Sequence, residues 1–203
     1  DMDVARTWMG ETPATDSADM IVTLGGPMST RDARKHPWLI HEKAFLLRMI
    51  ADGARALGIC LGAQLLAEVL GGEVTQATHR EIGWHRITVS PGADGTRAFR
   101  DLAGDLPAFH WHGETFMLPA GATRLASSAA CENQGFEWND GQVVGLQFHW
   151  EYAPECVRTM ITECAEDLGS GQYCQEPGEM LERTSEFERS RTLMFGLLDR
   201  LAV

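Results

Sequence analysis

Segments with two different hydrophobic periods alternate along the chain. Residues 20–24 form a short apolar run that ends at a Gly-Gly-Pro sequence, which predicts a buried strand followed by a tight loop. Apolar positions then recur along one broad stripe and predict a helix of about 38–52. A second apolar run at 54–59 passes directly into helical spacing over 61–70, so the order here is strand, sharp turn, helix.

The second half of the chain adds strands and then helices. Strand-like segments separated by Gly, Pro, Asp and Asn recur at 86–90, 109–112, 124–128 and 143–149. Positions 157–168 carry the apolar spacing of an amphipathic helix, and the pattern from 178 onward fits either one long helix or two. Alternating strands and helices predict an α/β layered fold.

Composition narrows the class of protein. With 203 residues, 44% of them hydrophobic, the chain is expected to form one domain over 1–203 with a sizeable core. A formal net charge of −12 argues against a nucleic-acid partner. The sequence has no run of about 20 apolar residues and no signal pattern, so no membrane partner is expected. Five cysteines without a C-x-x-C fit a reducing compartment, and we expect a cytoplasmic protein.

The turn at 58–62 is the first candidate for chemistry. Gly58-Ile59-Cys60-Leu61-Gly62 is a G-x-C-x-G, the arrangement of a nucleophile elbow with cysteine at its centre. Small flanking residues relieve the crowding of such a turn, and the positive end of the following helix favours a thiolate. The N–H of Leu61 would point to where an oxyanion forms. Alternatively, Cys60 is a small buried hydrophobe in a tight turn.

A second candidate lies at the end of the last apolar run. In a strand the period of two would place His149 and Glu151 on one face, with Trp150 on the other. Glu151 could then orient one ring nitrogen of His149 and leave the other to act as a base toward a thiol. The alternative is an exposed histidine beside a strand-end glutamate. Gly25 and Gly26, after the first strand, would let backbone N–H groups approach a developing anion.

These motifs together resemble a known family. GGP at 25–27, GICLGAQ at 58–64 and GLQFHWE at 145–151 resemble, in order and separation, the three signatures of the class I glutamine amidotransferases. The resemblance implies a flavodoxin-like α/β fold, an open and mostly parallel sheet with helices on both faces. It also implies a glutaminase that needs no cofactor. The substrate would be glutamine or another γ-glutamyl compound.

The resemblance also implies roles for individual residues. Cys60 would attack the glutamine side-chain amide, His149 would move the proton and Glu151 would orient His149. The amides of Gly26 and Leu61 would form the oxyanion hole, and Gly25 and Gln64 would hold the substrate. The sequence Trp111-His112-Gly113-Glu114 resembles the S-H-G-D of the GMP synthase amidotransferase, which implies substrate contacts for His112, Gly113 and Glu114.

Within the family, the chain most resembles stand-alone proteins related to GMP synthase. It carries a helical extension at about 154–203 and begins near the family's second strand, so we expect that the first strand and helix are missing from it. It has no ATP pyrophosphatase loop or G-x-x-x-x-G-K-[ST] motif, so ammonia would pass to a separate synthetase chain. The C-terminal segment could also form a homodimer contact.

Three alternatives remain open at this point. The same triad could cleave γ-glutamyl peptides, or the chain could be a non-catalytic interaction protein that keeps the fold. His110 and His112 could be two metal ligands on one strand face, completed by His79 or His85. Because no patterned third and fourth ligand accompanies them, the expectation is that the protein holds no metal.

Overall fold

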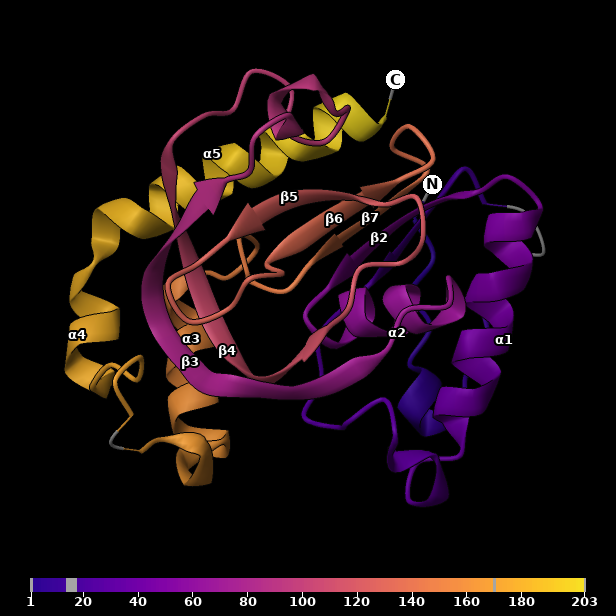
Figure 1. Cartoon of the computed structure of the whole chain (residues 1–203). Coiled ribbons are helices and arrows are strands. Elements are labelled where there is room, and N and C mark those ends of the chain that lie inside the picture. Colours follow the sequence, from indigo (N-terminus) through magenta and orange to yellow (C-terminus); the bar gives the residue numbers. More distant parts are fainter. Residues whose placement is uncertain (1, 14–17, 170, 203) are drawn as a thin grey trace.

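The computed structural model describes residues 2–13, 18–169 and 171–202. Its strands and helices follow the predicted alternation (Figure 1). The strands are β1 (Met20–Thr23), β2 (Arg55–Ile59), β3 (Val74–Val89), β4 (Asp105–Phe116), β5 (Thr123–Ser127), β6 (Gly135–Trp138) and β7 (Val143–Leu146). The α-helices are α1 (Trp38–Ala51), α2 (Leu61–Val69), α3 (Pro154–Glu163), α4 (Pro177–Glu182) and α5 (Thr184–Leu201). Short 3-10 helices are η1 (Thr7–Met9), η2 (Asp32–Arg34), η3 (Ala93–Gly95) and η4 (Ala165–Asp167).

The seven strands of the described ranges form one open sheet of order β1-β2-β7-β6-β5-β3-β4. The predicted open α/β sheet is confirmed, but it is mixed rather than mostly parallel. Among these strands β1-β2 and β2-β7 pair in parallel, and the other four pairs are antiparallel. The consecutive pairs β3-β4, β5-β6 and β6-β7 are joined without an α-helix between them, and such connections return the chain in the opposite direction.

Helices cover both faces of the sheet, as predicted. The strand period of two turns Ala56 and Val143 toward α1 and α2, while Leu57 and Val144 face α5. In Figure 1, α1 and α2 accordingly lie on the other side of the central strands from α5. β2 and β7, which carry the two main motifs, are therefore enclosed from both sides.

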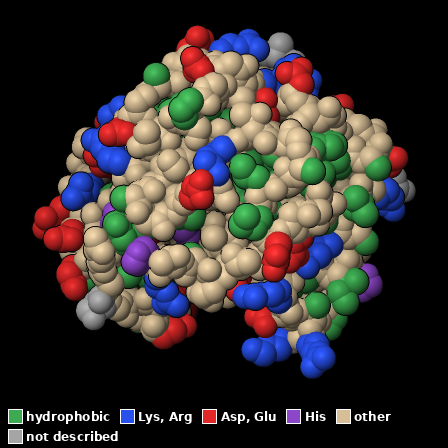
Figure 2. Space-filling model, viewed as in Figure 1, with side chains coloured by type: hydrophobic (Ala, Val, Ile, Leu, Met, Phe, Trp, Pro, Cys, Tyr) green, Lys and Arg blue, Asp and Glu red, His purple; other side chains and the backbone are tan. Residues whose placement is uncertain are grey.

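The C-terminal segment resolves into two helices. Arg183 has φ −84° and ψ 56°, outside the helical region, and separates α4 from α5. α3 and α4 pack against β3 and β4, and Trp84, Trp111 and Val157 belong to the buried cluster between these elements. None of the described helices combines the length and apolarity that crossing a membrane requires. On the face in Figure 2, basic side chains are interspersed with acidic ones.

Four strands differ from the predictions. β3 and β4 are much longer than the predicted segments 86–90 and 109–112, and β6 had no prediction. The predicted strand 143–149 ends at Leu146. β7 stops there because its neighbour β2 gives way to α2 at the same level, where the ladder hydrogen bonds end.

Candidate active site

Cys60 occupies a strained turn between β2 and α2. Its backbone has φ 54° and ψ −109°, a region that L-residues rarely adopt and that costs about 1–3 kcal/mol. The N–H of Cys60 donates to the carbonyl of Leu146 at 2.7 Å, which anchors the turn to β7. The next residue, Leu61, begins α2, so the thiol lies at the positive end of the helix.

The two flanking glycines are required by close backbone approach. A Cβ on Gly58 would lie 2.5 Å from the backbone of Gly62. A Cβ on Gly62 would collide with the backbone carbonyl of Thr23 at the end of β1. The G-x-C-x-G spacing therefore lets α2 start directly against β1 and β2.

His149 and Glu151 interact although they are not on a strand. The chain bends over 147–151, and the backbone of His149 pairs instead with Phe109 of β4 through hydrogen bonds of 2.7 and 3.2 Å. The predicted strand geometry is thus wrong, but the predicted contact forms: Nδ1 of His149 lies 2.6 Å from Oε1 of Glu151. Nε2 of His149 is left for the thiol of Cys60.

Burial and the neighbouring charge of Glu151 act on the pKa of His149 in opposite directions. Its exposed fraction is 2%, and burial by itself would lower the pKa of its ring. The charge on Glu151 and the hydrogen bonds with Cys60 and Glu151 outweigh burial and raise the pKa of His149 to about 10. The ring of Tyr152 stacks on that of His149 at 4.1 Å between centroids. The arrangement favours the protonated form of His149 beside Cys60.

The glycine pair after β1 lies against this group. A Cβ on Gly25 would lie 3.4 Å from both Cβ of Cys60 and Cε1 of His149, so Gly25 lies against both side chains. A Cβ on Gly26 would come within 3.2 Å of Cδ2 of Leu61. Gly26 and Leu61, the two predicted oxyanion-hole residues, are therefore neighbours.

A cavity of about 520 Å³ opens beside these residues. Cys60, His149, Gly25, Gly26 and Leu61 all line it, as do Gln64, His112, Gly113 and Glu114. Every residue assigned to the site from the sequence lines this cavity except Glu151, which lies behind His149. In Figure 2 the surface is notched at its lower edge, between the segments that hold α3 and η2 in Figure 1. Residues of both segments, Met160 and Asp32, also line the cavity.

Comparison with known families agrees with this geometry. The family model described as "Glutamine amidotransferase class-I" matches residues 3–164. The chain belongs to the class I glutamine amidotransferases.

Relatives and solved structures extend the comparison. The chain is 30% identical to glutamine amidotransferase-like protein YfeJ of Salmonella typhimurium, over 98% of this chain and 85% of that protein. It is 36% identical to the GMP synthase [glutamine-hydrolyzing] of Lacticaseibacillus casei over 64% of this chain, but only 24% of that enzyme. The crystal structure of a glutamine amidotransferase from Thermotoga maritima covers 98% of this chain and 85% of its own at 34% identity, with a TM-score of 0.85.

The amidotransferase site contains a buried glutamine that sequence reasoning missed. Gln147 donates from Nε2 to Sγ of Cys60 at 3.7 Å and accepts from Gln64 at 3.1 Å. Gln64 also donates to the carbonyl of Glu114 at 3.2 Å. Gln147 lies inside the third signature, two residues before His149, and that position was the available signal. Tyr152 was missed as well, although it directly follows Glu151.

Residues 111–114 of the amidotransferase line the cavity, and the side chains of three of them also contact other residues. The carboxylate of Glu114 accepts from Ser29 at 3.1 Å and pairs with Arg31. Trp111, which stands where the GMP synthase pattern has serine, donates from Nε1 to Asp167 at 3.1 Å. His112 turns both ring nitrogens toward protein atoms, since Nδ1 faces the Glu114 carbonyl at 3.1 Å and Nε2 lies 3.2 Å from Glu81.

Glu81 itself is buried behind the cavity, together with His110. Burial alone would raise the pKa of Glu81, but its contacts with His112 and His110 lower it to about 2. Burial lowers the pKa of His110 to about 3, against the opposing charge of Glu81. At neutral pH the Glu81 carboxylate is therefore charged and the His110 ring is neutral.

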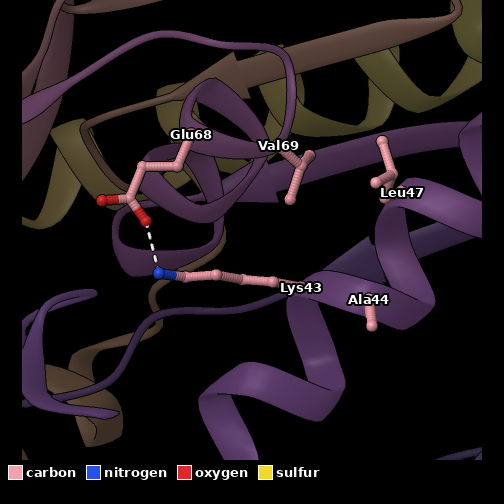
Figure 3. A pocket seen from close by; sticks show the side chains of 5 residues that line it. All are labelled: Lys43, Ala44, Leu47, Glu68 and Val69. Carbon is pink, nitrogen blue, oxygen red and sulfur yellow. Dashed lines mark ion pairs between the residues drawn. The ribbon is translucent and has the colours of Figure 1, made fainter.

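A second pocket lies between α1 and α2. Figure 3 shows Lys43 reaching from α1 to form an ion pair with Glu68 of α2. Lys43 also donates to the carbonyl of Thr30 at 2.9 Å, and the hydroxyl of Thr30 donates to Glu68 at 2.9 Å. These contacts hold Thr30 between Ser29 and Arg31, the two residues that contact Glu114.

Proposed function

We propose that this amidotransferase hydrolyses the side-chain amide of glutamine to glutamate and ammonia through a γ-glutamyl thioester on Cys60. The observation that carries the proposal is the joint burial of Cys60 and His149 at one cavity, with Glu151 2.6 Å from the far nitrogen of His149. Membership of the family supports the same reaction.

The chemistry follows from the positions of three groups. The thiolate of Cys60 attacks the δ-carbonyl carbon of glutamine, and negative charge collects on the carbonyl oxygen. The amides of Leu61 and Gly26 are the donors proposed for that oxygen, because they adjoin each other beside the thiol. His149 gives its proton to the departing amine, so that ammonia leaves and the thioester remains.

Water completes the cycle. Neutral His149 takes a proton from water as the water attacks the thioester carbonyl, and the second tetrahedral intermediate expels the Cys60 thiolate with glutamate. The raised pKa of His149 returns it to the imidazolium form that the next attack requires. Glu151 keeps Nδ1 of His149 protonated throughout and so leaves Nε2 to face the thiol.

We also propose that the ammonia is used by a separate chain. In Sulfurisphaera tokodaii, a protein named as one subunit of GMP synthase [glutamine-hydrolyzing] is 41% identical over 47% of this chain and 50% of its own. The aligned region spans 24% of the L. casei GMP synthase, so most of that enzyme lies outside the similarity. Both relationships fit a separate partner chain that activates the molecule to which the ammonia is added.

The test is product release from the purified full chain. Glutamate and ammonia are followed with glutamine and, separately, with γ-glutamyl dipeptides. We expect equal amounts of glutamate and ammonia from glutamine, loss of both in Cys60→Ala, and unchanged rates in Cys156→Ala, a variant at an exposed cysteine. Turnover of the dipeptides but not of glutamine would support a γ-glutamyl peptide hydrolase instead. No product from either substrate, with and without candidate synthetases, would support a non-catalytic role.

A further inference from the structure

Three side chains with metal-ligand chemistry converge inside the sheet, behind the cavity. Glu81 of β3 is the register partner of His112 on β4, and His110 lies two residues before His112 on the same strand face. All three side chains are buried, with exposed fractions of 1%, 0% and 6% for Glu81, His110 and His112. One ligand atom from each can be chosen so that all three atoms lie within 4.8 Å of one another.

Three nitrogens of this cluster have no hydrogen-bond partner among the described residues. Neither ring nitrogen of His110 has a hydrogen-bond partner there, although the ring is wholly buried. Nε2 of His112 also has none, even though it lies 3.2 Å from Oε2 of Glu81. Buried polar atoms without partners are costly and uncommon in folded proteins. In neutral His110 one of the two nitrogens carries a lone pair, which could bind an electron-pair acceptor.

The orientation of His112 indicates which kind of acceptor fits. Nδ1 of His112 lies 3.1 Å from the carbonyl of Glu114, and only an N–H can satisfy that oxygen. In the neutral ring, Nε2 then directs its lone pair toward the carboxylate of Glu81. This nitrogen and the carboxylate oxygen are 3.2 Å apart, and a proton or a metal ion between them stabilises the pair.

We propose that Glu81, His110 and His112 bind one divalent transition-metal ion of the zinc class. Two imidazoles and one carboxylate suit such an ion, and a tetrahedral site would separate its ligand atoms by about 3.3 Å. The structure has 3.2 Å from Glu81 to His112 and 3.9 Å from Glu81 to His110, so His110 has to approach Glu81 by less than 1 Å. The fourth position would be taken by water.

The surroundings of the cluster resemble those of a metal site. Ser128 donates to Oε1 of Glu81 at 2.8 Å, and Gln134 donates to Oε2 at 2.6 Å, so the carboxylate is held from behind. The Nδ1 of His112 is held by a backbone carbonyl, as ligating histidines commonly are. The two partners suggested by the sequence do not join the cluster: His79 is exposed, and His85 lies 2.9 Å from the carbonyl of Tyr173.

The bound ion would fasten β3 to β4 where the segment 111–114 borders the cavity. The carbonyl of Trp111 lies 3.8 Å from Sγ of Cys60, and the carbonyl of Glu114 accepts from Gln64. An ion bound at His112 would therefore fix the part of the cavity lining that faces the thiol of Cys60. This role is structural and does not depend on the proposed glutaminase reaction.

The test is a metal titration of the Cys60→Ala chain, because a thiolate and His149 could themselves bind zinc. The chelator-stripped protein is titrated with Zn²⁺ and, as a spectroscopic probe, with Co²⁺. We expect one ion per chain, a tetrahedral Co²⁺ spectrum, and a rise in Tm of about 5–10 °C with Zn²⁺ at about 100-fold its Kd. In the same background, His79→Gln should leave all three readouts unchanged.

The His110→Phe and Glu81→Gln variants, each in the Cys60→Ala background, decide the outcome. Each should lose the Co²⁺ spectrum and the Zn²⁺-dependent rise in Tm, while metal-free His110→Phe should unfold no earlier than the metal-free parent, because it removes two unpaired buried nitrogens. Two results would overturn the proposal. One is no binding by the parent, which would leave a buried glutamate–histidine pair only. The other is undiminished binding in either variant.

Discussion

Gln64 and Gln147 are joined by a hydrogen bond of 3.1 Å between their side chains, although 83 residues separate them. Both are buried, and Gln147 continues the chain of contacts to Sγ of Cys60 at 3.7 Å. Through this pair the first helix turn after the elbow is connected to the segment that carries His149. The relative position of thiol and imidazole therefore depends on a neutral side chain as well as on the triad.

Replacing Gln147 should reduce turnover more than substrate binding. Gln147→Leu removes the donor to Cys60 and the acceptor for Gln64, and we expect kcat for glutamine to fall about 10-fold to 100-fold, with a smaller change in KM. Gln172→Leu, at an exposed glutamine, is the matched control. An unchanged kcat would show that Gln147 does not help to position the thiol.

The nucleophile and its base should behave as one unit. Cys60→Ala and His149→Ala are each expected to lower glutamine turnover by about 10⁴-fold or more, and the double variant should lose little beyond either single one. Steady-state glutamate release measures all three. Additive losses in the double variant would mean that the two residues act in separate steps.

The charge of His149 should be visible in the alkylation rate of Cys60. Because the pKa of His149 is raised to about 10, the imidazolium persists across neutral pH and stabilises the thiolate. At pH 7 the rate of Cys60 modification by iodoacetamide should therefore be higher in the chain that keeps His149 than in His149→Ala. Equal rates in the two chains would show that the charge of His149 does not act on the thiol. Cys156→Ala serves as the parent so that an exposed thiol does not contribute.

The same raised pKa predicts how stability depends on pH. A histidine whose folded pKa lies above its unfolded value of about 6.5 adds stability that is fully present below that value. The contribution fades as pH rises through about 10, where His149 loses its proton in the folded chain. The difference in Tm between wild type and Glu151→Gln should therefore shrink between about pH 6.5 and 10, as measured by thermal unfolding. A difference that grows over this interval would contradict the assignment.

Adding one methyl group at the elbow should be costly. In Gly62→Ala the new Cβ meets the carbonyl of Thr23, so β1 and α2 must separate, and we expect a loss of about 2–4 kcal/mol in the free energy of unfolding. Gly178→Ala is the control, because a Cβ there meets no atom within 4 Å and lies in α4. Denaturant unfolding measures both. Equal stabilities would show that the elbow tolerates a side chain.

Local patterns predicted most elements because hydrophobic period reports which face of an element is buried. β1, α1, β2 and α2 agree with the predicted segments to within one residue at each end. β6 was missed because Gly135–Trp138 is only four residues long and lacks an extended apolar run. The lengths of β3 and β4 were underestimated because polar residues such as Glu81 and Glu114 lie inside the strands, paired across the hairpin.

The sequence by itself determined the chemistry that is available: a cysteine at a glycine-flanked turn, a His-x-Glu and a glycine pair, each readable from neighbouring residues. Tertiary structure alone decided that they meet, because the parallel register that sets Gly58 beside Gly145 brings the ends of β2 and β7 together. It also replaced the predicted strand at His149 with a bend and gathered Glu81, His110 and His112 behind the cavity. Such contacts depend on strand order and on where each ladder ends, and the periodicity of a single segment carries no information about either.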